Sequence, residues 1–265
     1  AAGPARARKG REMADAGVRQ GVGVAITGDR IVAVDADAAL HRAYPNAHVV
    51  DCASGLLAPG FVDSHTHTVF GAARYAEHEL RATGVPYLEI AKRGGGIHSS
   101  VRDLRQRSND ELLALAQPRL ATLAAGGVTT VEIKSGYGLT VHDEVRTLRV
   151  IRALAQAGPV NIVATCLGAH EVPLEYREQP DGRVAWIDAI CGELYPAVGA
   201  EQLARFADVF CEPGVFTVEE SRRILTAASP FGMRPKLHAD ELHDGGAAVL
   251  AAELGAVSAD HLAAI

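Results

Sequence analysis

Aromatic residues are scarce in this 265-residue sequence, at 5% of the chain, so its core must be built mainly from Ala, Val, Leu and Ile. No apolar run approaches the roughly 18 residues of a membrane span, and no signal-peptide pattern is present. The four cysteines are far apart and include no Cys-x-x-Cys pair. We therefore expect a cytoplasmic protein with reduced thiols and no membrane partner, not a disulfide framework or a zinc knuckle.

Positive charge is also limited, because 26 Lys and Arg stand against 32 Asp and Glu, for a net charge of −6. The one basic cluster, formed by Arg6, Arg8, Lys9 and Arg11, is short, lacks aromatic neighbours and is typical of a solvated chain end. The sequence therefore predicts no nucleic-acid partner. A hydrophobic content of 48% excludes intrinsic disorder and allows a sizeable core.

The first 56 residues have the pattern of a small β element. Two β-branched runs within 22–34 flank a turn that contains Gly28, which predicts a hairpin. A helical period follows around 37–43, and a third short run at 48–51 precedes a turn at 53–55. We assign residues 1–56 to the N-terminal part of a small β domain.

From residue 57 the pattern changes to strands that alternate with helices. Helix starts are marked by Ser108 with Glu111, by Thr140 with Asp143 and by Thr217 with Glu220. A last helix is expected at about 246–254, and the long connections 68–107 and 169–206 are expected to be functional. The predicted strands are apolar on both faces, which indicates a parallel sheet covered by helices, either doubly wound or most of a barrel; they span 57–64, 128–134, 160–168, 207–212, 234–239 and 256–260.

Histidines gather at the ends of these predicted strands. His65 and His67 are two residues apart, so on a strand they share a face. His170, His238 and His261 close three further strands, so four of six strand ends carry histidine, although the whole chain has only 11. An isolated His-x-His would more often be a surface pair, but this distribution favours a metal-centred catalytic site at the carboxyl ends of the strands.

These motifs resemble a known family. The stretch 59–67, Pro-Gly-Phe-Val-Asp-Ser-His-Thr-His, resembles the first metal-binding strand of the amidohydrolase superfamily. The stretches 65–71, 132–139, 167–170 and 236–241, together with the glycine loop at 94–97, are similar to the imidazolonepropionase family. That resemblance implies a TIM-like (β/α)8 barrel, of which residues 57–265 would supply about six of the eight strands.

The resemblance also implies an activity, the metal-dependent hydrolysis of the cyclic amide 4-imidazolone-5-propanoate to N-formimidoyl-L-glutamate in histidine degradation. It implies one Zn²⁺ or Fe³⁺ per subunit, which accept the same ligands, and a homodimer. The implied metal ligands are His65, His67 and His238. The implied substrate contacts or catalytic groups are Arg74, Tyr137, His170 and Glu241.

Each implied role has a physical reason. Arg74 could clamp the propanoate carboxylate with paired charge-assisted hydrogen bonds, and the glycines that flank Tyr137 permit close approach of a ligand. Glu241, three residues after His238, could act as general base on the attacking water. His170 and His261 could polarise the ring carbonyl or protonate the leaving nitrogen, although a buried structural role for His261 is equally possible.

Lys134 ends an early strand beside the expected substrate loop, and we interpret it as a supporting group and not as a bridge between two metal ions. Two other functions stay open. One is a related amidohydrolase that acts on another cyclic amide or deaminates a heterocycle. The other is a metal-binding fragment without activity.

The expected metal shell lacks one ligand. Sites of this superfamily usually include an Asp from the eighth strand, and no Asp of this sequence matches that position, since Asp260 belongs to the sixth predicted strand. We therefore expect a chain that ends at Ile265 to show little or no hydrolase activity. Robust turnover of 4-imidazolone-5-propanoate by such a chain would contradict this expectation.

Overall fold

The computed structural model describes residue 8 and residues 10–86, 89–90 and 94–265. Arg6 and Lys9 of the basic cluster lie outside the described residues. The chain divides into two units, Ala1–Pro59 and Gly60–Ile265, and each is described by itself. Among the residues placed in the structure, no helix is long and apolar enough to cross a membrane.

The first unit contains the hairpin that the sequence predicts. Strand β1 (Val22–Thr27) pairs antiparallel with β2 (Arg30–Ala36), and Gly28 in the turn has a φ of 61°. The short helix η1 (Gly10–Ala14) precedes the hairpin and α1 (Asp37–Ala43) follows it. The run at 48–51 forms no strand, although the turn expected after it is present, with a bond of 2.7 Å from Gly55 N to Cys52 O.

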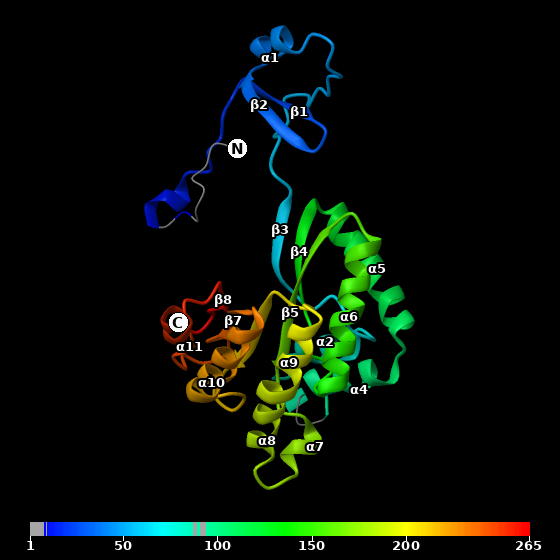
Figure 1. Cartoon of the computed structure of the whole chain (residues 1–265), viewed down its shortest axis with the longest axis vertical. Helices are drawn as coiled ribbons and strands as arrows, with labels where there is room; N and C mark the ends of the chain where they lie inside the picture. Colours follow the sequence, from blue (N-terminus) through cyan, green and yellow to red (C-terminus); the bar gives the residue numbers. More distant parts are fainter. Residues whose placement is uncertain (1–7, 9, 87–88, 91–93) are drawn as a thin grey trace. The chain divides into compact units, whose positions relative to one another are not determined.

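The second unit confirms the barrel-like α/β fold. The described residues of this unit form six parallel strands that lie in chain order in one sheet, so each strand pairs with the next one along the sequence. The first begins later than the predicted residue 57, after Pro59 and Gly60. A Cβ at Gly60 would lie 2.2 Å from the Thr129 side chain, so the two strands approach closely there. The strands are β3 (Phe61–Thr66), β4 (Val128–Lys134), β5 (Asn161–Ala169), β6 (Phe206–Cys211), β7 (Arg234–Ala239) and β8 (Ala259–His261) (Figure 1).

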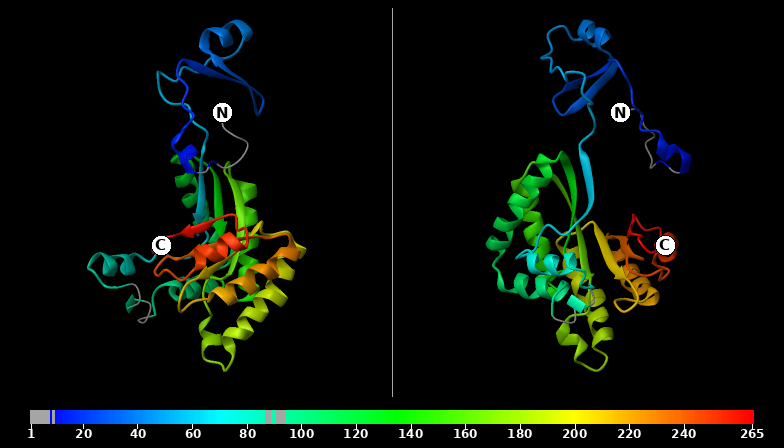
Figure 2. Two further views of the ribbon diagram at one scale, coloured as in Figure 1. Left: turned by 90° about the vertical axis from the view of Figure 1, so that its left-hand side faces the viewer. Right: turned by 180° about the vertical axis from the view of Figure 1, so that it is seen from behind.

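Helices connect these strands and lie on the outside of the sheet (Figures 1 and 2). The expected caps of α5 and α10 are complete capping boxes, and Thr140 caps α6 by accepting a bond from Asp143 N. Helix α5 continues through Pro118. The main helices are α2 (Tyr75–Ala82), α4 (Ile97–Gln106), α5 (Asn109–Ala125), α6 (Val141–Ala157), α8 (Gly182–Ala189), α10 (Val218–Ala228) and α11 (Ala247–Glu253).

The two long connections contain helices that the sequence patterns did not reveal. The connection after β3 contains α2 and α4. The connection after β5 contains α7 (Leu174–Arg177), α8, the π-helical turn η2 (Ile190–Leu194) and α9 (Tyr195–Ala200). A short turn, η3 (Ser229–Phe231), follows α10 and contains Pro230.

The two faces of each strand have different chemistry. On β4, Val131 and Ile133 are fully buried in the apolar core, which includes α5 and α6 side chains such as Leu120 and Leu148. Because strand side chains alternate, the residues between them project to the opposite face. That opposite face carries charged and histidine side chains. The face of the sheet that packs against the helices therefore forms the hydrophobic core, and the face that points away from them forms a polar site.

Candidate metal centre

Five histidines meet at the carboxyl ends of the strands. His65 lies on β3 and His67 directly after it, His170 follows β5, His238 lies on β7, and His261 ends β8. The ring centroids of His65 and His238 are 4.5 Å apart, and those of His67 and His170 are 5.0 Å apart in a stacked arrangement. The histidines predicted from the four strand ends are therefore brought together into one cluster.

Two overlapping groups within this cluster could hold an ion. One consists of His65, His238 and His261, and the other of His67, His170 and His238, with ring nitrogens within 4.8 Å of one another in each group. His238 belongs to both. The expected ligand set of His65, His67 and His238 therefore draws on both groups, which meet at His238.

Burial keeps the rings of His67 and His170 neutral, which suits them to bind a cation. Burial, together with the nearby His170 and His238, holds the pKa of His67 well below its usual value. Burial and the nearby His238 lower the pKa of His170 to about 3. Neutral imidazoles keep a lone pair free for a metal ion.

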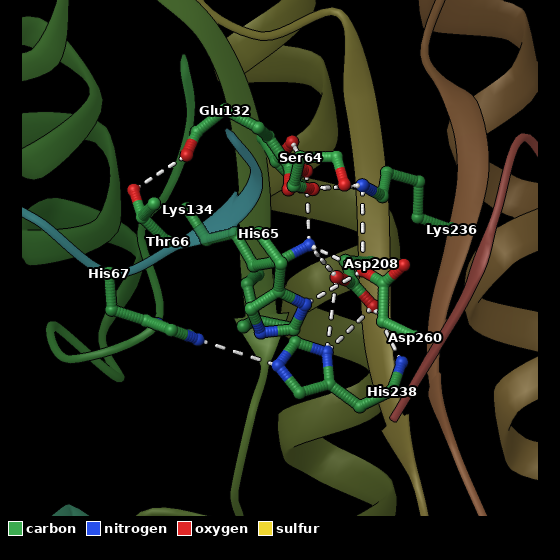
Figure 3. A network of polar contacts seen from close by, with 12 residues as sticks. Ser64, His65, Thr66, His67, Glu132, Lys134, Asp208, Lys236, His238 and Asp260 are labelled. Atoms are coloured by element: carbon green, nitrogen blue, oxygen red, sulfur yellow. Dashed lines mark hydrogen bonds and ion pairs between the residues drawn. The ribbon is translucent and has the colours of Figure 1, made fainter. Parts of the chain in front are cut away.

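The geometry around His67 fits an ion as well. Its Nε2 lies 3.4 Å from Nε2 of His238 (Figure 3), and its buried Nδ1 has no hydrogen-bond partner in the part of the chain that the structure describes. Two nitrogens at about 2.0–2.1 Å from one tetrahedral ion lie about 3.3 Å from each other. The described protein groups thus leave one nitrogen of the His67 ring without a hydrogen bond. The distance between the Nε2 atoms of His67 and His238 is the distance expected for two ligands of one ion.

Asp208 on β6 orients His238. Its Oδ1 lies 3.2 Å from His238 Nδ1 and also accepts a bond from His238 N at 3.1 Å, so both groups are held by one carboxylate (Figure 3). With the proton on Nδ1, the Nε2 lone pair points into the cluster. Carboxylate–histidine contacts of this kind fix the tautomer of metal ligands in proteins.

A layer of buried charges lies next to the histidines (Figure 3). Lys134 Nζ binds Asp208 at 2.6 Å, Glu132 at 3.0 Å and Asp260 at 3.3 Å. Burial alone would lower the pKa of Lys134, but the charges of Asp208 and Glu132 outweigh burial and raise it. Lys236 joins the layer by ion pairs with Glu132 and Asp260. Lys134 is thus fully buried and paired with three carboxylates. These contacts are of the kind expected for a group that supports the site.

Asp260 holds the other side of the cluster. Its Oδ2 lies 2.8 Å from His65 Nδ1, which directs the opposite ring nitrogen toward His238. Burial would raise the pKa of Asp260, but the bond from His65 and the charge of Lys134 lower it far below its usual value. The carboxylate is therefore ionised, and it orients His65 as Asp208 orients His238.

Sequence reasoning missed Glu132, Asp208, Lys236 and the role of Asp260. A signal was nevertheless present, because each charged residue lies within one of the predicted strands. Lys236 precedes His238 by two residues and Glu132 precedes Lys134 by two, so each pair shares a strand face. A charged residue inside an apolar strand is buried only when it is paired, which points to a polar interior.

A cavity of about 280 Å³ opens beside the cluster. Arg74 and Tyr137, two expected substrate contacts, line it together with His67, Phe70, Ala72, Ala73 and Ser100. Arg74 Nη1 lies 3.5 Å from Glu77, a long contact, and Glu77 also accepts a bond from Gly96 N in the glycine loop. The cavity thus combines a guanidinium, a phenol and one histidine of the cluster.

Glu241 lies beside His261, on the loop after β7. Its Oε2 is 3.5 Å from His261 Nε2. The buried Glu212 accepts bonds from the backbone N–H groups of Glu241 and Leu242 at 3.1 and 3.2 Å, so the loop is held in place. All eight residues expected at the site therefore lie in or beside the cluster.

The comparisons with known proteins agree with this geometry. No family model matches the chain. The chain is 51% identical over 259 residues to an imidazolonepropionase of Symbiobacterium thermophilum, covering 96% of this chain and 60% of that protein. It is 49% identical over 246 residues to an imidazolonepropionase of Myxococcus xanthus, covering 92% and 58%. The chain thus spans about three fifths of the length of these curated relatives.

A solved structure supports the fold independently. A 5-methylcytosine deaminase from Klebsiella pneumoniae, liganded with phosphonocytosine, matches with a TM-score of 0.60, covering 88% of this chain and 52% of that chain. The sequence identity is 16%, so the likeness concerns the barrel fold alone.

The contact between Asp208 and His238 gives a testable expectation. Asp208→Asn keeps the size of the side chain but weakens its hold on His238 Nδ1, so we expect Zn²⁺ affinity to fall by about 10- to 100-fold. Competition with a chromophoric chelator measures this affinity. Asp188→Asn is a matched control, because Asp188 is exposed and forms a surface ion pair with Arg223. Equal affinities for the two variants would refute the orienting role of Asp208.

Proposed function

Because the chain is a homologue of the imidazolonepropionases over nearly its whole length, we propose that the whole protein hydrolyses 4-imidazolone-5-propanoate to N-formimidoyl-L-glutamate. The observation that carries this proposal is the placement of Arg74 and Tyr137 in one cavity with His67, a member of the histidine cluster. That cavity offers a site for a carboxylate beside a site for a metal ion. A substrate with a propanoate arm and a ring carbonyl needs both.

We assign the metal to His65, His67 and His238, with Zn²⁺ and Fe³⁺ as the candidate ions. His238 contacts both other rings, and Asp208 and Asp260 orient His238 and His65. An ion bound there would act as a Lewis acid on the ring carbonyl and increase the acidity of water. The buried carboxylates beside the histidines add negative charge that favours a cation.

Arg74 binds the propanoate carboxylate in this proposal. Among the described residues its guanidinium has only the long contact to Glu77, so we take its hydrogen-bond donors to be available. Tyr137 lies 5.4 Å from His67 between ring centroids and forms the wall next to the reacting end of the substrate. Binding of the arm by Arg74 places the imidazolone ring near the cluster.

Glu241 and His261 transfer protons. Glu241 accepts a proton as water attacks the carbonyl carbon, and the ring C–N bond then breaks as its nitrogen is protonated. His261 lies 3.5 Å from Glu241 and provides the route by which the proton passes from Glu241 to the ring nitrogen. The hydrolysis consumes one water and opens the ring without any other reactant. The carbonyl carbon becomes a carboxylate, and the protonated nitrogen stays in the product as part of its formimidoyl group.

His170 has a different task. Its Nδ1 lies 2.9 Å from the Gly136 carbonyl, which requires a proton on Nδ1 and leaves Nε2 as an acceptor. Its low pKa prevents a second proton near neutral pH. His170 is therefore placed to accept a hydrogen bond from a ring N–H of the substrate, and not to donate one to the carbonyl.

The role of Glu241 predicts a loss of turnover. Glu241→Gln keeps the shape of the side chain but cannot accept the proton from water, so kcat should fall by about 100-fold or more. The whole protein is assayed for formation of N-formimidoyl-L-glutamate. Glu253→Gln, on the exposed end of α11, should retain activity. Undiminished kcat in Glu241→Gln would exclude it as the base.

The role of Arg74 predicts a loss of binding. Arg74→Ala removes the charge-assisted contact to the carboxylate, so KM should rise by about 10- to 100-fold with a smaller change in kcat. Arg223→Ala, an exposed residue paired with Asp188, is the control. An unchanged KM would refute the assignment.

The assay also separates the alternative functions. Turnover only of other cyclic amides or of heterocyclic amines would indicate a different amidohydrolase. Metal binding without turnover would indicate that the protein is not an enzyme.

A further inference from the structure

The loop after β4, residues 135–139, is held by one carboxylate that the catalytic roles leave unused. Glu144 on α6 is fully buried. Its Oε2 accepts a bond from Gly136 N at 2.9 Å, and its Oε1 accepts bonds from Gly138 N at 2.8 Å and Leu139 N at 2.9 Å. Three backbone N–H groups of one short loop thus converge on a single side chain.

This convergence requires an unusual backbone. Gly136 has a φ of 103° and Leu139 a φ of 49°, both in the left-handed region. A Cβ at Gly138 would lie 2.6 Å from the backbone of Asp143 and Glu144, so the loop is pressed against the start of α6. Leu139 has no glycine freedom, and its conformation is maintained by its surroundings.

The carbonyl groups of the loop are held as well. Arg105 on α4 donates to Gly138 O at 2.7 Å and to Leu139 O at 2.9 Å. Gly136 O accepts the bond from His170 Nδ1. The loop is therefore bound on its N–H side by Glu144 and on its carbonyl side by Arg105 and His170.

A simple helix-start role does not account for Glu144. Thr140 and Asp143 already cap α6, and an acidic residue in a first turn stabilises a helix while exposed to water. Within the described residues, the Glu144 carboxylate instead directs its hydrogen bonds to the loop. Burying a carboxylate is costly unless it is fully hydrogen-bonded, so this side chain is matched to the loop.

The loop presents two groups to the proposed substrate site. Tyr137, which lines the cavity with Arg74, stands between Gly136 and Gly138, whose N–H groups are both bound by Glu144. His170 takes its tautomer from the carbonyl of Gly136. A shift of the loop would therefore move Tyr137 and release His170 together.

We propose that Glu144 is a positioning residue for substrate binding, which fixes Tyr137 and His170 beside the cavity through the 135–139 loop. The inference rests on the proposed function for its effect on binding, but its effect on the loop is independent of any reaction. Glu144 touches neither substrate nor metal ligand in this arrangement. Its replacement should therefore alter KM and leave the metal affinity unchanged.

The test uses Glu144→Gln in the whole protein. The amide has one acceptor oxygen and an NH₂ group that faces N–H donors, so at least one of the three loop bonds is lost. We expect faster hydrogen–deuterium exchange of the Gly136, Gly138 and Leu139 amides and a KM raised about tenfold, with Zn²⁺ affinity within twofold of the wild type. Glu111→Gln is the matched control, because Glu111 also binds a backbone N–H but lies exposed in the α5 capping box, where Gln is accepted.

Two further variants keep the test decisive. Arg105→Ala removes the carbonyl-side contacts from a partly exposed position, and it should raise loop exchange and KM even if Glu144→Gln fails to fold. In a Tyr137→Ala background, Glu144→Gln should raise KM less than it does alone, because it acts partly through Tyr137. Unchanged loop exchange in both Glu144→Gln and Arg105→Ala, or fully additive effects on KM, would overturn the proposal. Loop exchange remains measurable if the wild type fails to turn over the substrate, so failure of the proposed function is recognised separately.

Discussion

The buried pair of Lys134 and Asp208 is the interaction on which the site depends. Both side chains are fully buried, and the nitrogen–oxygen distance is 2.6 Å. Removing two charges from water is costly, and it is offset only when each charge is fully paired. Here Glu132, Asp260 and Lys236 complete the pairing, and the three carboxylates exceed the two ammonium groups by one negative charge. The polar face of the sheet is thus held together by paired charges. Their excess negative charge favours a cation at the neighbouring histidines.

The loops above this layer are also held by buried carboxylates. Glu144 gathers three N–H groups of the loop after β4, and Glu212 gathers two of the loop after β7. Asp240 accepts bonds from Gly245, Ala247 and Ala248 at the start of α11. Loops at the carboxyl ends of barrel strands carry functional groups, and irregular loops need partners for their backbone N–H groups. A buried carboxylate supplies those partners and fixes the loop at the same time.

The parts of the fold that depend on local sequence could be predicted. The hairpin around Gly28 and the caps at Ser108, Thr140 and Thr217 involve residues at most a few positions apart, and the histidines mark strand ends directly. Asp208 and Glu144 could not be assigned, because their partners lie on other strands and loops and have no fixed spacing from them. The start of β3 was misplaced because its pairing with β4, a segment distant in sequence, begins only at Phe61 opposite Val128.

For the proposed reaction, the surroundings of His170 and His261 suit these two histidines to different roles. His170 is fully enclosed, and burial lowers its pKa to about 3, so near neutral pH it only accepts hydrogen bonds. Burial also lowers the pKa of His261, but the Glu241 carboxylate beside it acts in the opposite direction and the ring is partly exposed. Groups whose surroundings separate their pKa values take different acid–base roles. In the proposed reaction, proton transfer is therefore assigned to the Glu241–His261 side of the cluster, and substrate recognition to the side formed by Arg74, Tyr137 and His170.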